Sequence, residues 1–212
     1  MADLVVDRYE IAVEVLESGE PQAANRVIDG DNELNDWYLD IEANCMELIG
    51  RHEPLAGDLR CIASSFKIVT DLERISDLAT NLAAYGRESN GSLGETIPIT
   101  SIAATAGGMV EDAMEAYTKQ DADLARAVVA RDDELDTACR RASEAVVREL
   151  VAASRSESPE ALSADRSDID DRIEHVMRAQ LTLRDLERVG DHAVNICART
   201  VYMLENDTGL IY

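Results

Sequence analysis

Residues 71–81 read DLERISDLATN, and residues 185–195 read DLERVGDHAVN. Seven of the eleven positions are identical in the two copies. An internal repeat constrains the architecture strongly, because each copy is expected to form the same structural unit. Both copies keep an acidic pattern, Glu-x-x-x-Asp-x-x-x-Asn, together with the apolar residues around it. The repeat therefore predicts a chain built from two similar halves.

The spacing of this pattern predicts a helix. At about 100° per residue, Glu73, Asp77 and Asn81 fall within about 80° of arc. Five apolar residues fall on the opposite side of the same helix: Ile68, Leu72, Ile75, Ala79 and Leu82. We therefore expect an amphipathic helix whose apolar side is packed and whose carboxylates are directed outward.

The acidic stripe has two interpretations. Glu and Asp stacked at i,i+4 repel each other by about a few tenths of a kcal/mol. A row of carboxylate and amide oxygens is also what a hard or borderline cation prefers. A solvated polar face in a very acidic protein would explain the same residues. The duplication of a mildly unfavourable spacing favours a ligand-binding stripe.

A second internal match joins residues 27–35 (VIDGDNELN) to residues 128–136 (VVARDDELD). It places Asp31 with Asn35 in the first half, and Asp132 with Asp136 in the second. In an antiparallel bundle, the start of the second helix can lie near the end of the third. That arrangement would bring two acidic pairs together within each half, although capping and solubility explain these residues equally well.

The remainder of the sequence is typical of a helical protein, with 4% aromatic residues and four prolines. Glycine- and proline-containing stretches separate six expected helices, at 3–18, 22–49, 55–85, 99–119, 121–153 and 164–205. Long helices joined by short turns pack antiparallel as bundles. We expect an all-α protein of two tandem three-helix bundles, residues 1–86 and 98–212, joined by a linker at 87–97.

The net charge of −23 comes from 43 Asp and Glu against 20 Lys and Arg, of which two are Lys. Such a surface is typical of adaptation to high salt, where screening removes self-repulsion. An ordinary acidic cytosolic protein is the alternative. Either way, the charge argues against nucleic-acid binding, which needs a basic surface.

The four cysteines form no CxxC pair and lie within apolar helical patterns, so we expect reduced core thiols in the cytosol. No apolar run approaches the ~20 residues that span a bilayer, and the N-terminus does not resemble a signal peptide. These features predict a cytoplasmic protein, with peripheral docking on a membrane complex still open. Long amphipathic helices with few aromatics also predict apolar surface for a homodimer.

No nucleophile–base set, P-loop or glycine-rich nucleotide loop is present, so the sequence does not favour an enzyme. One alternative is a ferritin-like di-metal carboxylate enzyme, whose site needs Glu-x-x-His motifs inside a helical bundle. No glutamate in this chain has a histidine three residues later. A metal-free helical adapter is the other alternative.

The doubled motif resembles the PhoU family of phosphate-uptake regulators. The resemblance extends to Leu59-Arg60 and KIVT at 67–70 before the first motif, to residues 27–35, and to the C-terminal helix around 195–203. It implies two three-helix bundles, a homodimer and multinuclear metal clusters. It also implies regulation of the phosphate-specific ABC transporter through its ATPase and, where present, a sensor kinase.

Carried over residue by residue, the resemblance assigns metal binding to Glu73 and Asp77, and to Glu187 and Asp191. The further candidates are Asp31, Asp132 and Asp136. The metal is iron, zinc or another divalent cation, because carboxylate-rich sites accept several ions. The chain departs from the family pattern at Ser76, where the second copy has Gly190, and at Asn35, which lacks the charge of Asp136.

Overall fold

The computed structural model describes residues 1–52, 54–95, 97–156 and 166–211, and within these residues the regular structure is entirely helical. This confirms the all-α prediction. The α-helices are α1 (Ala2–Ser18), α2 (Pro21–Asp29), α3 (Asp31–His52), α4 (Ala56–Glu88), α5 (Ile99–Lys119), α6 (Ala122–Val129), α7 (Asp132–Ser156) and α8 (Arg166–Glu205), with a 3₁₀ turn η1 (Ser92–Glu95).

The prediction of six helices was wrong in number, because the second and fifth are each divided. The first break falls at Gly30, between α2 and α3, and the second at 130–131, between α6 and α7. At the second break the chain tightens, and the Arg131 N–H donates to the Val128 carbonyl at 2.9 Å. Both breaks fall in the matching stretches 27–35 and 128–136. The repeat therefore extends to the interruption as well as to the motif.

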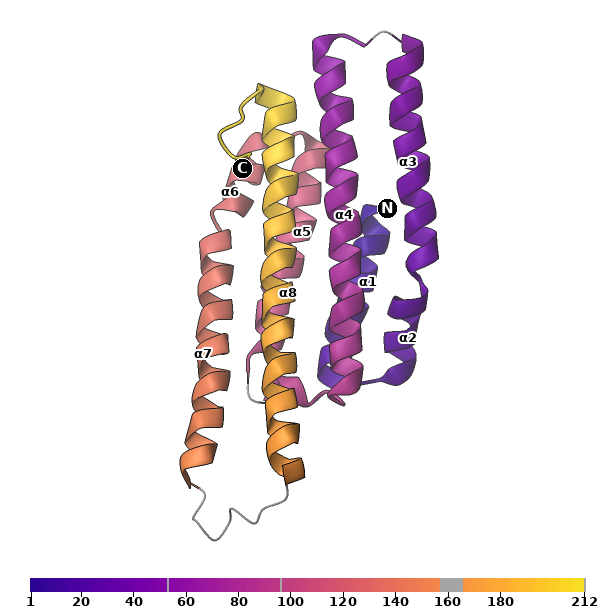
Figure 1. The fold of residues 1–212 in the computed structure, drawn as a ribbon. Helices are drawn as coiled ribbons and strands as arrows, with labels where there is room; N and C mark the ends of the chain where they lie inside the picture. Colours follow the sequence, from indigo (N-terminus) through magenta and orange to yellow (C-terminus); the bar gives the residue numbers. More distant parts are fainter. Residues whose placement is uncertain (53, 96, 157–165, 212) are drawn as a thin grey trace.

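The two long helices α4 and α8 run side by side through the middle of the molecule (Figure 1). In that view α1 lies behind α4, α5 lies behind α8, and α3 and α7 flank the pair. The apolar side predicted for α4 is buried, since Ile68, Leu72, Ile75, Ala79 and Leu82 are each at most 2% exposed. One continuous core runs from α1 through α4 and α8 to α7.

The connection between the halves depends on two glycines. Gly19 ends α1 in the left-handed region at φ 65°, where a Cβ would lie 2.5 Å from the Asn90 carbonyl carbon. Gly91 has φ 75°, and a Cβ there would lie 2.3 Å from the Glu17 carbonyl oxygen. Only glycine fits such close backbone contacts without strain. The segment after α4 is thereby held against the end of α1.

The cysteines are free thiols, as expected, but one is not in the core. Cys45, Cys139 and Cys197 are buried, whereas Cys61 on α4 is exposed. The difference arises because the first turns of α4 extend past α1 and are covered mainly by α3. A helical apolar pattern predicts one packed side, but it does not show how far along the helix a neighbour reaches.

Candidate acidic site on two motif helices

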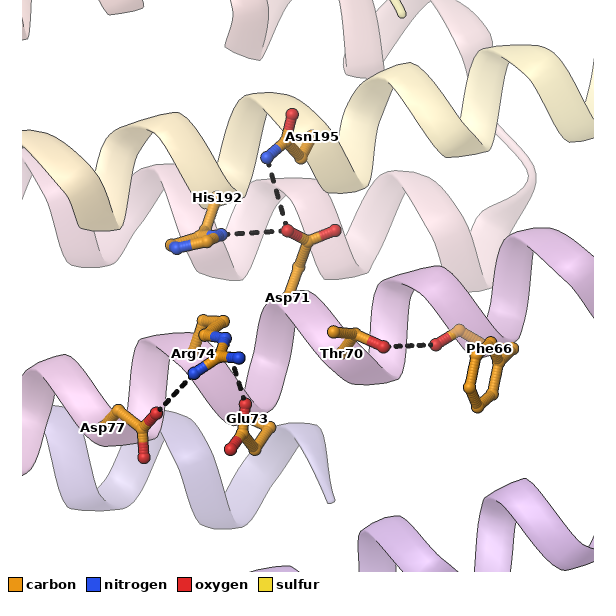
Figure 2. Close-up of polar contacts among 8 residues, drawn as sticks. All are labelled: Phe66, Thr70, Asp71, Glu73, Arg74, Asp77, His192 and Asn195. Atoms are coloured by element: carbon orange, nitrogen blue, oxygen red, sulfur yellow. Dashed lines mark hydrogen bonds and ion pairs between the residues drawn. The ribbon is translucent and has the colours of Figure 1, made fainter.

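The first acidic stripe lies on α4, on the side opposite the buried apolar residues. Glu73 and Asp77 are partly exposed, with 30% and 42% of their side chains accessible. Arg74 lies between them, with its Nε 3.5 Å from a Glu73 oxygen and its Nη1 3.2 Å from an Asp77 oxygen (Figure 2). The guanidinium of Arg74 therefore already compensates part of the negative charge of this stripe.

The second stripe lies on α8 and faces the start of α7. Asp132 is partly buried and its pKa is raised to about 6, first by burial and then by Asp136, Asp191, Asp133 and Glu187. Burial and the charge of Asp136 also raise the pKa of Glu187 and of Asp191. Four of the predicted metal residues, from two helices, thus form one electrostatically coupled group. We call Asp132, Asp136, Glu187 and Asp191 the α7–α8 cluster.

One oxygen of this cluster lacks a partner. Asp132 Oδ1 is inaccessible to solvent, and no hydrogen-bond donor reaches it in the part of the chain that the structure describes. The charges of His192 and then Arg188 partly offset the rise in the pKa of Asp191, although Arg188 forms no ion pair with Asp191 among the described residues. Arg188 instead lies 3.5 Å from Asp185. The cluster is therefore less compensated by protein cations than the stripe on α4.

Close packing of α7 on α8 brings the cluster together. A Cβ added at Gly190 would lie 2.3 Å from Leu135 Cδ2 and 3.5 Å from Asp132 Oδ1. Glycine therefore lets the first turn of α7 rest directly on α8. In the first half, the equivalent position is Ser76, which is fully buried and whose hydroxyl has no hydrogen-bond partner among the described residues. The substitution noted in the sequence thus distinguishes the packing of the two halves.

The predicted metal residues are only partly assembled. Asp31 begins α3, but its side chain lies outside the described part of the structure, and Asn35 is exposed. Across the described residues, no three His, Cys, Asp or Glu groups lie close enough together to hold one metal ion as placed. The structure thus brings Glu73 to Asp77 through Arg74, and unites the α7–α8 cluster. It does not join the two sets.

A cavity of about 790 Å³ opens beside the cluster, between α7 and α8. Its lining includes two acids, Asp136 and Glu187, and two arginines, Arg140 and Arg184. Cys139 is also in the lining, but burial raises the pKa of its thiol to about 12. The sulfur therefore stays protonated near neutral pH and offers no thiolate. The donors that the cluster presents are carboxylate oxygens.

The first Asp of each motif has a role that the sequence interpretation missed. Asp71 on α4 accepts hydrogen bonds from two residues of α8, His192 Nδ1 at 2.9 Å and Asn195 Nδ2 at 3.3 Å (Figure 2). His192 was set aside because its counterpart Leu78 is apolar. It binds a carboxylate of the other half rather than joining the acidic stripe.

The second motif makes the reciprocal contact. Asp185 is fully buried, and it accepts hydrogen bonds from Asn81 Nδ2 and the Tyr85 hydroxyl of α4, each at 3.3 Å. Each motif therefore binds the other through its first Asp and its last Asn. We call the pairs Asp71–Asn195 and Asp185–Asn81 the crossed pairs. The sequence did carry a signal for these pairs: both motifs keep an Asp and an Asn ten positions apart.

Comparison with known proteins identifies the family. A family model for the PhoU domain matches residues 1–85 and 99–200. The phosphate-specific transport system accessory protein PhoU homolog of Pseudomonas putida is 33% identical over 207 residues, which cover 96% of this chain and 75% of that protein. The homolog of Pseudomonas aeruginosa is also 33% identical, over 96% of this chain and 79% of the relative.

Solved structures agree with this assignment. The crystal structure of PhoU from Pseudomonas aeruginosa matches with a TM-score of 0.80 and 30% identity, covering 98% of this chain and 93% of that one. A regulatory protein PhoU of the phosphate transport system from Streptococcus pneumoniae matches with a TM-score of 0.81, and its 22% identity supports the fold alone. None of the described helices is both long and apolar enough to cross a membrane. The chain belongs to the PhoU family.

Proposed function

We propose that this protein is a non-enzymatic regulator of phosphate uptake and phosphate homeostasis that binds cations at its acidic stripes. Family membership supports the regulatory part, because the relatives are named as accessory proteins of the phosphate-specific transport system. In this proposal the protein is a cytoplasmic homodimer. Its binding partners are the ATPase of a phosphate ABC transporter and a sensor kinase. The acidic stripes support the cation-binding part.

The α7–α8 cluster is the observation that carries the cation proposal. Burial and neighbouring carboxylates raise the pKa of Asp132, Glu187 and Asp191, and a buried oxygen of Asp132 has no hydrogen-bond donor in the described structure. A set of oxygen donors fits a hard or borderline divalent or ferric ion. Asp136, Glu187 and Asp191 are exposed enough to turn, and Asp132 supplies the inner oxygen. A bound cation would neutralise repulsion between the start of α7 and α8.

Metal analysis tests this part. Protein purified without chelator and without a nickel column is expected to retain cations, and the variant Asp132→Asn/Asp136→Asn/Glu187→Gln/Asp191→Asn is expected to lose those of the second half. A matched control removes four charges elsewhere on exposed helix positions: Glu33→Gln, Asp36→Asn, Asp40→Asn and Glu149→Gln. Equal metal content in wild type and the cluster variant would refute cation binding at the cluster.

A pull-down at native salt tests the regulatory part. We expect wild-type protein to recover the ATPase of a phosphate ABC transporter from native lysate. Loss of the ATPase in the cluster variant would show that cation occupancy and recognition are coupled. Equal recovery would separate the two functions. Failure to recover the ATPase, together with unchanged phosphate uptake after gene deletion, would refute the phosphate regulator.

A metal-free helical adapter is the second candidate, and the stripe on α4 favours it. Arg74 already contacts both Glu73 and Asp77, so that stripe has less need of an added cation. The adapter would recognise the same partners through its surface alone. Retained ATPase binding in protein stripped of metal would support it.

We also propose that the surface is adapted to high salt. The net charge of −23 disfavours the compact state through self-repulsion, which salt screens. The midpoint of thermal unfolding should rise between about 0.1 M and 1 M KCl. A flat or falling midpoint would argue for an ordinary acidic protein instead.

A further inference from the structure

A groove crosses from one half of the molecule to the other. It has a volume of about 350 Å³ and lies between α1 and α5, the first helix of each half. Both helices lie behind α4 and α8 in Figure 1. Its floor is apolar, formed by buried Val5, Tyr9, Ala103 and Val110, with Ile75 of α4 beneath.

Two glycines shape this groove. A Cβ at Gly107 would lie 2.8 Å from the Tyr9 ring, so glycine lets Tyr9 lie flat across α5 and donate its hydroxyl hydrogen to the Ala103 carbonyl at 2.8 Å. Gly108 has only Arg131 Nη2 near its Cβ position, at 3.5 Å. Ala104 is exposed at the edge of the groove. These small residues leave a depression where larger side chains would form a ridge.

The rim of the groove carries charge of one sign. Glu10 and Glu14 lie on α1 and Glu111 on α5, and all three are exposed. In the part of the chain that the structure describes, no ion pair or side-chain hydrogen bond engages their carboxylates. The exposed Glu115 of α5, in contrast, is paired with Lys119. No Lys or Arg is among the residues that line the groove, and Arg131, which lies near Gly108, is already paired with Asp112.

We propose that this groove is the docking site for a basic amphipathic helix of a partner protein. An apolar floor between acidic rims matches a helix with apolar side chains on one face and Lys or Arg on its flanks, which is a recurring mode of recognition. A second copy of this chain fits less well, because it would bring acidic rims together. The inference goes beyond the cation-binding regulator proposed above and does not require it.

A designed peptide is a direct probe. It would be a fluorescein-labelled helix of about 18 residues, or 27 Å, with leucines on one face and lysines on both flanks. A second peptide would carry Glu in place of Lys. Binding would be followed by fluorescence anisotropy at about 0.15 M salt, where non-specific attraction is screened beyond about 8 Å. We expect saturable binding of the basic peptide only.

Matched variants then locate the site. Ala104→Trp fills the groove from an exposed position, and Gly108→Ala does so more gently while favouring the helix. We expect Ala104→Trp to weaken peptide binding by about tenfold or more, which is about 1.4 kcal/mol. Glu10→Gln/Glu14→Gln/Glu111→Gln should weaken it about several-fold. The control Glu33→Gln/Asp36→Asn/Asp40→Asn, with the same change of charge on α3, should bind within about twofold of wild type.

Several outcomes would overturn the inference. Unchanged peptide binding by Ala104→Trp would show that the peptide binds elsewhere. Equal weakening by the α3 control would show that the loss of affinity in the rim variant comes from the change in net charge. Absence of saturable binding would exclude a basic helix as the occupant. Dissociation of a wild-type dimer by Ala104→Trp, seen by light scattering, would make a second copy the occupant. Metal content should be unchanged by Ala104→Trp, which separates this test from that of the cation proposal.

Discussion

The stripe on α4 and the stripe on α8 share a motif but differ in what lies opposite them. On α4, Arg74 contacts both Glu73 and Asp77. On α8, the equivalent Arg188 is directed to the buried Asp185, and the stripe faces two carboxylates of α7. One stripe is therefore compensated within its own helix, while the other accumulates negative charge. Two similar motifs therefore differ in electrostatic environment because different residues pack against them.

The packing of that neighbouring helix has a local cause. Gly190 admits Leu135 to the surface of α8, whereas the first copy has Ser76 at the same motif position. A single methylene and hydroxyl thus distinguish the two interfaces. Four predictions, ordered from the largest expected effect to the smallest, can break or sharpen the comparison between the halves.

The largest expected effect is the difference in protein stability between breaking one crossed pair and breaking the other. Asp185→Ala removes a fully buried acceptor and leaves Asn81 and Tyr85 without their partner. We expect a loss of about 3 kcal/mol in the free energy of unfolding. Asp71 is 15% exposed, so Asp71→Ala should cost about 1 kcal/mol. Urea unfolding of both variants measures this difference, and equal losses would contradict the asymmetry.

Converting the second interface to the first should come next. The Cβ that Gly190→Ser adds would lie only 2.3 Å from Leu135 Cδ2, so the buried leucine must move. Overpacking of this kind costs about 2 kcal/mol. Hydrogen exchange at the start of α7 should accelerate as well. The reverse change, Ser76→Gly, should cost about 1 kcal/mol or less, because lost helix propensity is partly offset by removal of an unpaired hydroxyl. A larger loss for Ser76→Gly would reverse the comparison.

Removing one carboxylate should stabilise the second half without metal. The pKa of Asp132 is raised from 3.8 to about 6, so the folded protein holds this proton more tightly than the unfolded chain. The resulting stability is complete below about pH 4 and is lost as the pH rises through about 6. Asp132→Asn should therefore gain about 1 kcal/mol at pH 7 in the presence of chelator, after allowance for solvent screening.

A pH series of denaturant melts measures this gain. The slope of stability between about pH 4 and 6 should become shallower in Asp132→Asn, although Glu187 and Asp191 still contribute to it. Asp36→Asn on α3 is the control, since Asp36 is exposed and is not among the groups that raise the pKa of Asp132. If Asp132→Asn destabilised the metal-free protein at pH 7, the prediction would be contradicted, because the Asp132 carboxylate would then stabilise the fold.

Removing the arginine of the α4 stripe should have the smallest effect on stability. Arg74→Gln leaves Glu73 and Asp77 without their shared cation and should change stability by less than about 0.5 kcal/mol, as for other exposed ion pairs. In a background lacking the α7–α8 cluster, titration with Mn²⁺ should show about threefold tighter binding to this stripe. Arg148→Gln, which breaks the exposed pair with Glu144, should leave Mn²⁺ binding unchanged. Weaker binding in Arg74→Gln would show that the arginine supports the site.

Much of this protein followed from the sequence alone. Period and duplication predicted the motif helices and their buried side, because an amphipathic pattern has one stable orientation against a core. The spacing of Asp132 and Asp136 likewise suggested that α7 would carry acids toward α8. The helix breaks at 30 and 130–131 were missed, because an interruption of one or two residues barely alters a helical pattern.

Only the tertiary structure decided how the copies are used. The crossed pairs join residues of α4 and α8 that are far apart in sequence, and Asp71 and Asp185 appear in the motif as ordinary helix residues. The partner of each arginine was likewise undetermined, since a long flexible side chain chooses among neighbours that packing supplies. The sequence determined which residues lie on each helix face. The contacts across α4, α7 and α8 determined which carboxylates are compensated, because electrostatic interaction depends on distances between helices that no single-helix period contains.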